Sequence, residues 1–386
     1  MKHHIKKTAV TAVSVLTSSL LLLCSCADNG TVSGGEASTL STEAQQAQLQ
    51  PTTEPATEDE LTKQRRERLQ TAVNEYMAQC DFSGSILISV DGVDLAEYSH
   101  GFADKSNATP NTRSTKIELG SITKQFTSVA IMQLQEQGKL SVSDTVDTYI
   151  PEYDFGDQMT VENLLNMTSG IPDFLNSMIY LQSIGEIDMM EPATFEDVLS
   201  FANSNGIEFT PGSSFSYSNT NYMLLGEIIA RQSGVTYEKF VEENILKPLG
   251  MTNTSMNMND ADAVGYLIDG TEGDKSDTTY FGAAGEIASC TVDMSRWLNG
   301  LTSGKVVSQN SLYQMLGDSG MGYGYGWFIS QNGYYWHTGQ SMACYTMDLM
   351  SLDYGINVIV LSNVDDENVE TICVDLYNAT VGAIFQ

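Results

Sequence analysis

The stretch "ELGSITKQF", residues 118–126, decides the fold and poses the question of function. It places Ser121 three residues before Lys124, directly after Gly120, at the head of an apolar run. The apolar positions of that run recur with helical spacing, so we expect a helix that begins at or just before Ser121.

A serine and a lysine in this arrangement are open to two interpretations. Residues three apart share one face of a helix, and the first turn offers free backbone N–H groups that suit an oxyanion. Ser121 is then a nucleophile, provided that Lys124 is desolvated enough to act as its base. Alternatively, Ser121 is a helix cap and Lys124 a solvated lysine, which these residues alone favour.

The sequence on both sides of this stretch predicts one antiparallel sheet. Residues 84–101, "GSILISVDGVDLAEYSHG", are two alternating runs joined by Asp91-Gly92, which is typical of a hairpin. Residues 121–285 are mostly helical in pattern, strand-like runs follow, and residues 366–385 form an amphipathic helix. We therefore expect an α/β fold of the α+β kind, a sheet flanked by helices with a mostly helical insert at about 140–285.

The N-terminus has the pattern of an export signal. Residues 1–25 combine a basic start with a short apolar run, which predicts a signal peptide. The letters "LCSC", residues 23–26, resemble a bacterial lipoprotein signal with Cys26 as the lipidated residue; plain secretion is the alternative. Residues 26–59 are polar and without aromatics, which predicts a flexible tether before a catalytic domain at 60–386. We expect a protein on the outer face of a membrane, held there only by its lipid.

Composition excludes several classes of function. The net charge is −31, and removal of residues 1–25, which hold three lysines and no acids, would make it −34. Such a chain does not bind nucleic acid, which requires a basic surface. The glycine-rich residues 320–327 lack dinucleotide spacing, and the cysteines lack metal-ligand spacing, so we expect no cofactor and no metal. Four cysteines beyond the signal are predicted to have no catalytic role: Cys80, Cys290, Cys344 and Cys373.

A second serine imitates a nucleophile. Ser341 lies in "GQSMA", residues 339–343, close to His337. A nucleophile elbow places its serine between a strand and a helix, whereas this segment is expected to continue as a strand. We therefore predict that Ser341 is not the nucleophile, and we assign only a structural role to His100.

Two further motifs favour the interpretation of Ser121 as a nucleophile over its interpretation as a helix cap. Residues 215–222, "FSYSNTNY", contain Tyr217-Ser218-Asn219, and residues 334–340, "YYWHTGQ", contain His337-Thr338-Gly339. Together with the serine and lysine they resemble, in order and spacing, the signature elements of the penicillin-recognising serine hydrolases. The Tyr-x-Asn form resembles the branch with class C β-lactamases, D-alanyl-D-alanine carboxypeptidases and related esterases. The resemblance covers about residues 64–386 and implies the β-lactamase/transpeptidase-like fold.

The resemblance implies a role for each motif residue. Ser121 attacks a carbonyl to form an acyl-enzyme, and Lys124 assists in removing its proton. Tyr217 passes a proton to the leaving group, and the nearby lysine is expected to help this phenol act as a base. Asn219 holds Lys124 and the substrate amide. The N–H of Gln340 forms an oxyanion hole with that of Ser121.

The third motif departs from the β-lactamase pattern. Those enzymes usually carry lysine at the place of His337, where the cation helps to hold a substrate carboxylate, and histidine is only partly charged near neutral pH. With Thr338 and Gly339 kept, the resemblance favours a carboxypeptidase-like enzyme acting on D-amino-acid peptides of the cell wall. The alternatives are an esterase or β-lactamase of this fold, or a penicillin-binding sensor with little turnover. The expected partner is a small-molecule or peptide substrate, either a peptidoglycan peptide or a β-lactam.

Overall fold

A computed structural model describes residues 59–385 of the chain. The predicted signal peptide, Cys26 and the tether up to residue 58 lie outside the described residues. Asp59 caps the first helix, because its carboxylate accepts a hydrogen bond from the backbone N–H of Thr62 at 2.8 Å.

Ten strands form the described β-structure, six of them in one antiparallel sheet of order β2-β1-β10-β9-β8-β7. The Asp91-Gly92 turn joins β1 to β2 as the sequence predicts. The strands are β1 Gly84–Val90, β2 Val93–His100, β3 Phe102–Asp104, β4 Thr109–Pro110, β5 Ile117–Glu118, β6 Ala288–Ser289, β7 Phe328–Ile329, β8 Tyr335–Gln340, β9 Tyr345–Ser351 and β10 Ile356–Ser362.

Most helices lie between β5 and β6 in the chain, which matches the expected helical insert. The α-helices are α1 Glu60–Met77, α2 Thr123–Glu136, α3 Val161–Leu165, α4 Phe174–Ser183, α5 Phe195–Asn205, α6 Asn219–Ser233, α7 Tyr237–Val241, α8 Lys247–Leu249, α9 Thr291–Thr302, α10 Gln309–Met315 and α11 Asn368–Phe385. No helix within residues 59–385 has an apolar stretch long enough to cross a membrane.

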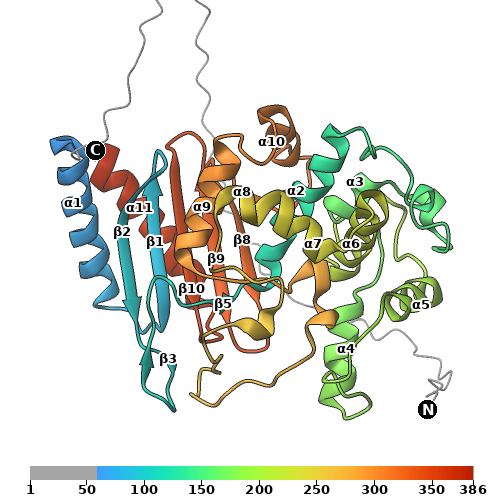
Figure 1. Ribbon diagram of the computed structural model, residues 1–386, viewed down its shortest axis with the longest axis horizontal. Coiled ribbons are helices and arrows are strands. Elements are labelled where there is room, and N and C mark those ends of the chain that lie inside the picture. The colour runs from blue at the N-terminus through green and yellow to red at the C-terminus, as the bar shows by residue number, and fades with distance from the viewer. Residues whose placement is uncertain (1–58, 386) are drawn as a thin grey trace, which may run out of the picture. The chain divides into compact units, whose positions relative to one another are not determined.

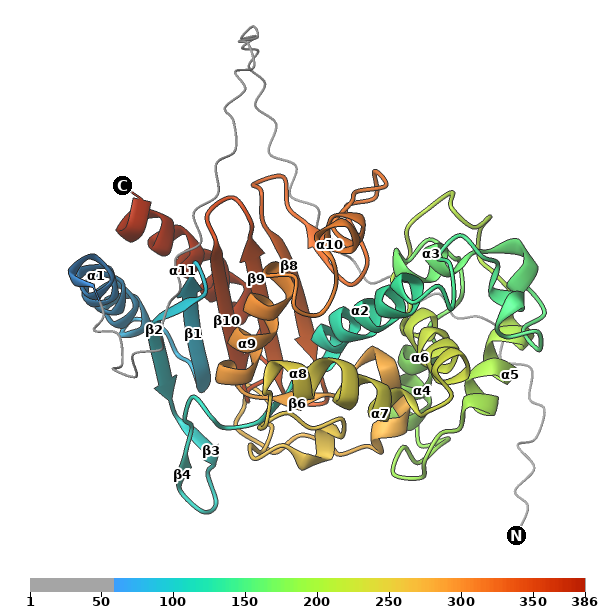
Figure 2. The same ribbon diagram turned by 45° about the horizontal axis from the view of Figure 1, so that its top comes forward.

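Helices cover both faces of the sheet, with α1 and α11 on one face and α9 on the other (Figure 1, Figure 2). Successive residues of each strand point to opposite faces. Ile86 and Ile88 of β1 accordingly join the apolar cluster with α1 and α11, whereas Leu87 joins the cluster with α2 and α9. The α2 helix lies between the sheet and the helical part of the molecule (Figure 2). This arrangement confirms the predicted fold class and places Ser121, at the start of α2, beside the sheet.

Candidate active site

Ser121 lies in a single 3-10 turn, η1 (Gly120–Ile122), which runs directly into α2. The predicted helix therefore begins at the serine, although its α-helical part starts two residues later. Two hydrogen bonds hold the turn in place: Leu119 N–H donates to the carbonyl of Ile287 at 2.8 Å, and Ile287 N–H donates to the hydroxyl of Thr123 at 3.2 Å. The backbone of the serine is thus fixed from both sides.

Strand β8 lies directly against this turn, and two glycines make the approach possible. Gly120 has a φ of +53°, and a Cβ at this position would lie 2.5 Å from the carbonyl oxygen of Gln340. A Cβ on Gly339 would lie 1.8 Å from the carbonyl oxygen of Leu119. Only glycine fits such contacts. The main chain of Gln340 consequently lies beside the residue before Ser121, which is where the predicted oxyanion hole requires it.

Lys124 is fully buried and makes three contacts around its amine. Its Nζ lies 2.8 Å from the Oγ of Ser121, from the Oδ1 of Asn219 and from the carbonyl oxygen of Ala284. Burial lowers the pKa of Lys124 to about 7, although the nearby carboxylate of Asp173 opposes the shift. A neutral amine has two N–H donors for the asparagine and the carbonyl, and one lone pair for the serine hydroxyl. The structure therefore gives Lys124 the desolvation that a base requires.

Tyr217 contacts the serine from the other side. Its hydroxyl donates to the Oγ of Ser121 at 2.8 Å, and the amine of Lys124 lies 5.0 Å from its ring centroid. Burial raises the pKa of Tyr217 far above its usual value of 10. The direction is opposite to the one that the expected base role requires: loss of water is the main cause of the raised pKa, and the nearby carboxylate of Asp173 adds to it. Tyr217 is therefore a protonated hydrogen-bond donor.

Asp173 is a member of the site that the sequence interpretation missed. Its Oδ2 accepts hydrogen bonds from the backbone N–H and the side-chain amide of Asn219, at 3.3 and 2.9 Å. The amide nitrogen of Asn219 thereby faces Asp173, and its oxygen faces Lys124. Burial raises the pKa of Asp173 above its usual value. The residue lies in "LLNMTSGIPDF", residues 164–174, a stretch that resembles the same family, but nothing in its pattern marks a carboxylate near the lysine.

The third motif divides between the two faces of the sheet. Opposite residues of paired strands point to the same face, and His337 pairs with Asp348 while Thr338 pairs with Met347 of the α1/α11 cluster. His337 and Gly339 thus face the serine side, and the side chains of Thr338 and Gln340 face the α11 side. The structure brings the histidine, the glycine and the Gln340 main chain to the serine, but not the threonine side chain.

Ser341 lies in the turn between β8 and β9, not in a continuing strand. Its N–H donates to the carbonyl of Cys344 at 3.1 Å, which closes the turn before β9 begins at Tyr345. No helix follows the turn, so the geometry of a nucleophile elbow is not formed here. The four cysteines of the described residues are free thiols, and Cys80 alone of them is not buried.

Known proteins with similar sequences share most of this chain. The family model described as Beta-lactamase matches residues 69–377. PbpX of Bacillus subtilis is 32% identical over 273 residues, which cover 68% of this chain and 66% of PbpX. Penicillin-binding protein 4* of Bacillus subtilis is 27% identical over 348 residues, 80% of this chain and 74% of that protein. The chain thus spans about two thirds to three quarters of the length of these relatives.

Solved structures agree with the sequence comparison. The octameric penicillin-binding protein homologue from Pyrococcus abyssi has a TM-score of 0.71 at 29% identity, covering 82% of this chain and 77% of the other. D-amino acid amidase from Ochrobactrum anthropi has a TM-score of 0.70 over 83% of this chain and 99% of its own, and at 23% identity it shows the fold alone. With the serine, lysine and tyrosine in mutual contact and a family match over most of its length, the chain belongs to the Beta-lactamase family.

Proposed function

We propose that this protein is a serine hydrolase that works through an acyl-enzyme. The observation that carries the proposal is the double contact at Ser121, whose Oγ lies 2.8 Å from both the amine of Lys124 and the hydroxyl of Tyr217. An amine with a pKa of about 7 is half-deprotonated near neutral pH, which suits a general base.

The contacts support the following reaction. Neutral Lys124 accepts the proton of the Ser121 hydroxyl while Oγ attacks the substrate carbonyl. The tetrahedral oxyanion is held by the N–H groups of Ser121 and Gln340. Tyr217 donates its proton to the leaving group as the carbon–leaving-group bond breaks, and regains a proton from the lysine. Water then hydrolyses the ester on Ser121, with Lys124 and Tyr217 again transferring the proton.

For the substrate we favour peptides or related derivatives of D-amino acids from the cell wall. Support comes from the motifs of the penicillin-recognising hydrolases and from relatives named as penicillin-binding proteins. The export signal at residues 1–25 and the candidate lipidation at Cys26 support a location on the outer face of a bacterial membrane, where such peptides occur.

Acylation by an uncharged active ester tests the proposal without assuming a natural substrate. The purified protein is mixed with p-nitrophenyl acetate, and both nitrophenol release and intact mass are followed. We expect acetylation of the wild type, and a loss of about a thousandfold or more in kcat/KM for Ser121→Ala.

Ser341→Ala is the matched control, because this serine lies in the turn after β8 and its hydroxyl contacts Glu118 and the N–H of Cys344, not Lys124 and Tyr217. It should acylate like the wild type. Full activity in Ser121→Ala, or loss only in Ser341→Ala, would exclude the proposed mechanism. An adduct that forms but does not turn over would favour a binding or sensor protein.

A further inference from the structure

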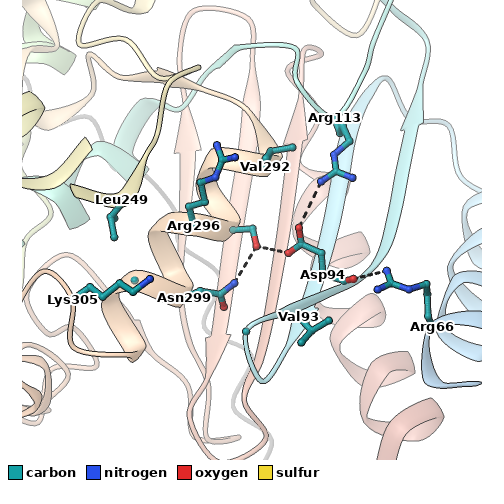
Figure 3. Close-up of a pocket in the computed structure, with 12 residues that line it drawn as sticks. Arg66, Val93, Asp94, Arg113, Leu249, Val292, Arg296, Asn299 and Lys305 are labelled. Atoms are coloured by element: carbon teal, nitrogen blue, oxygen red, sulfur yellow. Dashed lines mark hydrogen bonds and ion pairs between the residues drawn. The ribbon is translucent and has the colours of Figure 1, made fainter. Parts of the chain in front are cut away.

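Cationic side chains line a pocket at the edge of the sheet opposite the serine site. The pocket has a volume of about 640 Å³ and lies at the start of β2 (Figure 3). Because β2 is an edge strand and three strands separate it from β8, the pocket is distinct from the site around Ser121. The cations that line it come from α1, from the loop before β5, from α9 and from the residues after α9: Arg66, Arg113, Arg296 and Lys305.

The charge of this pocket contrasts with that of the chain. The chain holds 18 Lys and Arg against 49 Asp and Glu, yet the pocket is lined by four cations and one carboxylate, that of Asp94. A local excess of positive charge attracts an anion even where the net charge of the protein is negative. The volume is that of a site for a small molecule. The pocket therefore fits a small anionic ligand.

Neighbouring carboxylates use only part of the hydrogen-bonding capacity of these cations. Arg113 and Arg296 each hydrogen-bond one carboxylate through Nη1, those of Glu97 and Asp293 respectively. A guanidinium has five N–H donors, so both arginines keep donors for a further partner. Lys305 is exposed and forms no ion pair with any residue of 59–385. The pocket thus holds donors from several elements that an anion can use.

Asp94 gives the pocket one acceptor in a fixed position. Its Oδ1 accepts a hydrogen bond from the hydroxyl of Ser295 at 2.6 Å, and Nη2 of Arg113 lies 3.6 Å from its Oδ2 (Figure 3). The amide of Asn299 donates to the same serine at 3.2 Å. A carboxylate repels an anionic group but accepts a hydrogen bond from a hydroxyl. The site therefore combines donors for an anion with an acceptor for a hydroxyl group.

An extended peptide does not fit this edge of the sheet. A peptide that adds to an edge strand pairs with its unpaired N–H and C=O groups. On β2 the side chains of α1 cover such groups: Arg66 donates to the carbonyl of Asp94 at 2.6 Å, the N–H of Glu97 donates to Gln70 at 3.1 Å, and Gln70 donates to the carbonyl of Glu97 at 2.8 Å. A peptide would have to displace these side chains, whereas a small anion would not.

We propose that this pocket binds a phosphate ester that carries hydroxyl groups, such as a polyol phosphate or a sugar phosphate. Arginine matches the geometry of phosphate oxygens. A doubly charged phosphate suits a group of cations better than a single carboxylate does, and Asp94 accepts from a hydroxyl. The proposal is independent of the chemistry at Ser121. A free polyol phosphate and the headgroup of an anionic phospholipid share this chemistry, and the experiment separates them.

Calorimetric titration of the purified full chain with glycerol 1-phosphate tests the proposal. Inorganic phosphate and glycerol are the matched probes, because each carries one half of the proposed ligand. We expect glycerol 1-phosphate to bind, inorganic phosphate to bind severalfold more weakly, and glycerol not to bind. The affinity for the ester should fall as the salt concentration rises, because the site is exposed to solvent.

The variant Arg296→Gln/Lys305→Gln removes two of the cations and should weaken binding of the ester by about tenfold or more. Lys63→Gln/Arg68→Gln is the control of equal charge change, since both side chains are exposed on α1 and neither lines the pocket. Lys305→Gln alone should weaken binding by about threefold. This single variant keeps the pair of Arg296 with Asp293, so it serves if the double variant does not fold, which thermal unfolding checks.

Vesicles separate the two sources of the ligand. Sedimentation with phosphatidylglycerol or phosphatidylcholine vesicles is compared between the wild type and the double variant, which share the same N-terminal residues. Binding to phosphatidylglycerol alone that is lost in the variant, without binding of free glycerol 1-phosphate, would assign the pocket to a lipid headgroup. Binding of the free ester without a difference between the vesicles would assign it to a soluble phosphate.

Several results would overturn the proposal. It is wrong if neither the ester nor the vesicles bind, if the double variant binds like the wild type, or if the control on α1 loses as much affinity. Equal binding of inorganic phosphate and glycerol 1-phosphate would exclude the role of Asp94 as a hydroxyl acceptor. Ser121→Ala should bind the ester like the wild type, and a loss of binding in this variant would show that the ester occupies the serine site instead.

Discussion

The two faces of the six-stranded sheet are buried to similar degrees but with different chemistry. On the face toward α1 and α11 the buried residues are almost all apolar. On the face toward α2 the first turns of the helix bury Lys124, Gln125, Thr127 and Ser128, and β9 buries Asp348 beneath them. Burial of polar groups opposes folding unless they are hydrogen-bonded. The comparison suggests a division that can be tested: one face supplies stability, and the other holds the polar groups on which the proposed chemistry depends.

Lys124→Met should give the largest effect, because it removes the amine that is the proposed general base and keeps an unbranched apolar side chain in its place. We expect kcat/KM for p-nitrophenyl acetate to fall by about a thousandfold or more. In the wild type the neutral amine is the active form, so the rate should rise with pH through about 7. A pH profile from 5 to 9 measures this; a flat profile, or a variant with normal activity, would show that another group is the base.

Leu376→Ala tests the apolar face. Leu376 is fully buried on α11, and truncating a buried leucine typically costs about 2–5 kcal/mol of unfolding free energy. Urea unfolding measures the loss, and active-site titration gives the activity of each folded molecule, which should stay at the wild-type level. A change in kcat/KM per folded molecule would show that the two faces are coupled and that the division between them is wrong.

Asp173→Asn should lower activity by roughly ten- to hundredfold. Asp173 acts as a positioning residue, since its carboxylate orients the amide of Asn219 toward Lys124, and small displacements at such sites have effects of this size. Because the carboxylate also raises the pKa of Lys124, its removal should move the midpoint of the pH profile below 7. Asp157→Asn is the control of equal charge change. A loss of activity without a shift of the midpoint would indicate a structural role alone.

Much of this architecture could be predicted from local patterns. The Asp91-Gly92 turn, the alternating strands, the closing helix and the start of α2 all follow from periodicity and turn chemistry within a few residues. Ser121, Lys124, Tyr217 and Asn219 could be grouped because three motifs occur in the right order. Their contacts in the structure match the expected arrangement, and their catalytic roles stay predictions.

The parts that could not be predicted depend on long-range environment. The pKa of Tyr217 rises because residues distant in sequence exclude water from it, and no motif encodes that exclusion. Asp173 becomes a neighbour of Asn219 only when the starts of α4 and α6, 46 residues apart in the sequence, meet. The carboxylates near Thr338 come from the segment after β10 and from α11. Such neighbours are brought together by tertiary contacts and appear only when the chain is folded.

Asp348→Asn should have the smallest effect on activity. It tests whether every buried polar group on the α2 face contributes to the active site. Asp348 is buried, accepts a hydrogen bond from Gln125 at 2.7 Å, and has its pKa raised to about 7 by burial. The folded protein therefore holds this proton more tightly than the unfolded chain, whose carboxyl titrates near 3.8. Its contribution to the unfolding free energy is present at low pH and is lost as pH rises through about 7.

Asparagine has no proton to lose and keeps an oxygen for Gln125, so the variant should be more stable than the wild type at pH 8, by roughly 1–2 kcal/mol, and similar to it at pH 5. Urea unfolding at both pH values measures the difference, with the exposed Asp353→Asn as control. Unchanged esterase activity would show that Asp348 is a polar group of this face without a role in the chemistry. If activity falls while stability rises, Asp348, which pairs with His337 across β8 and β9, belongs to the site. The buried polar groups of the α2 face would then be kept for function at the expense of stability.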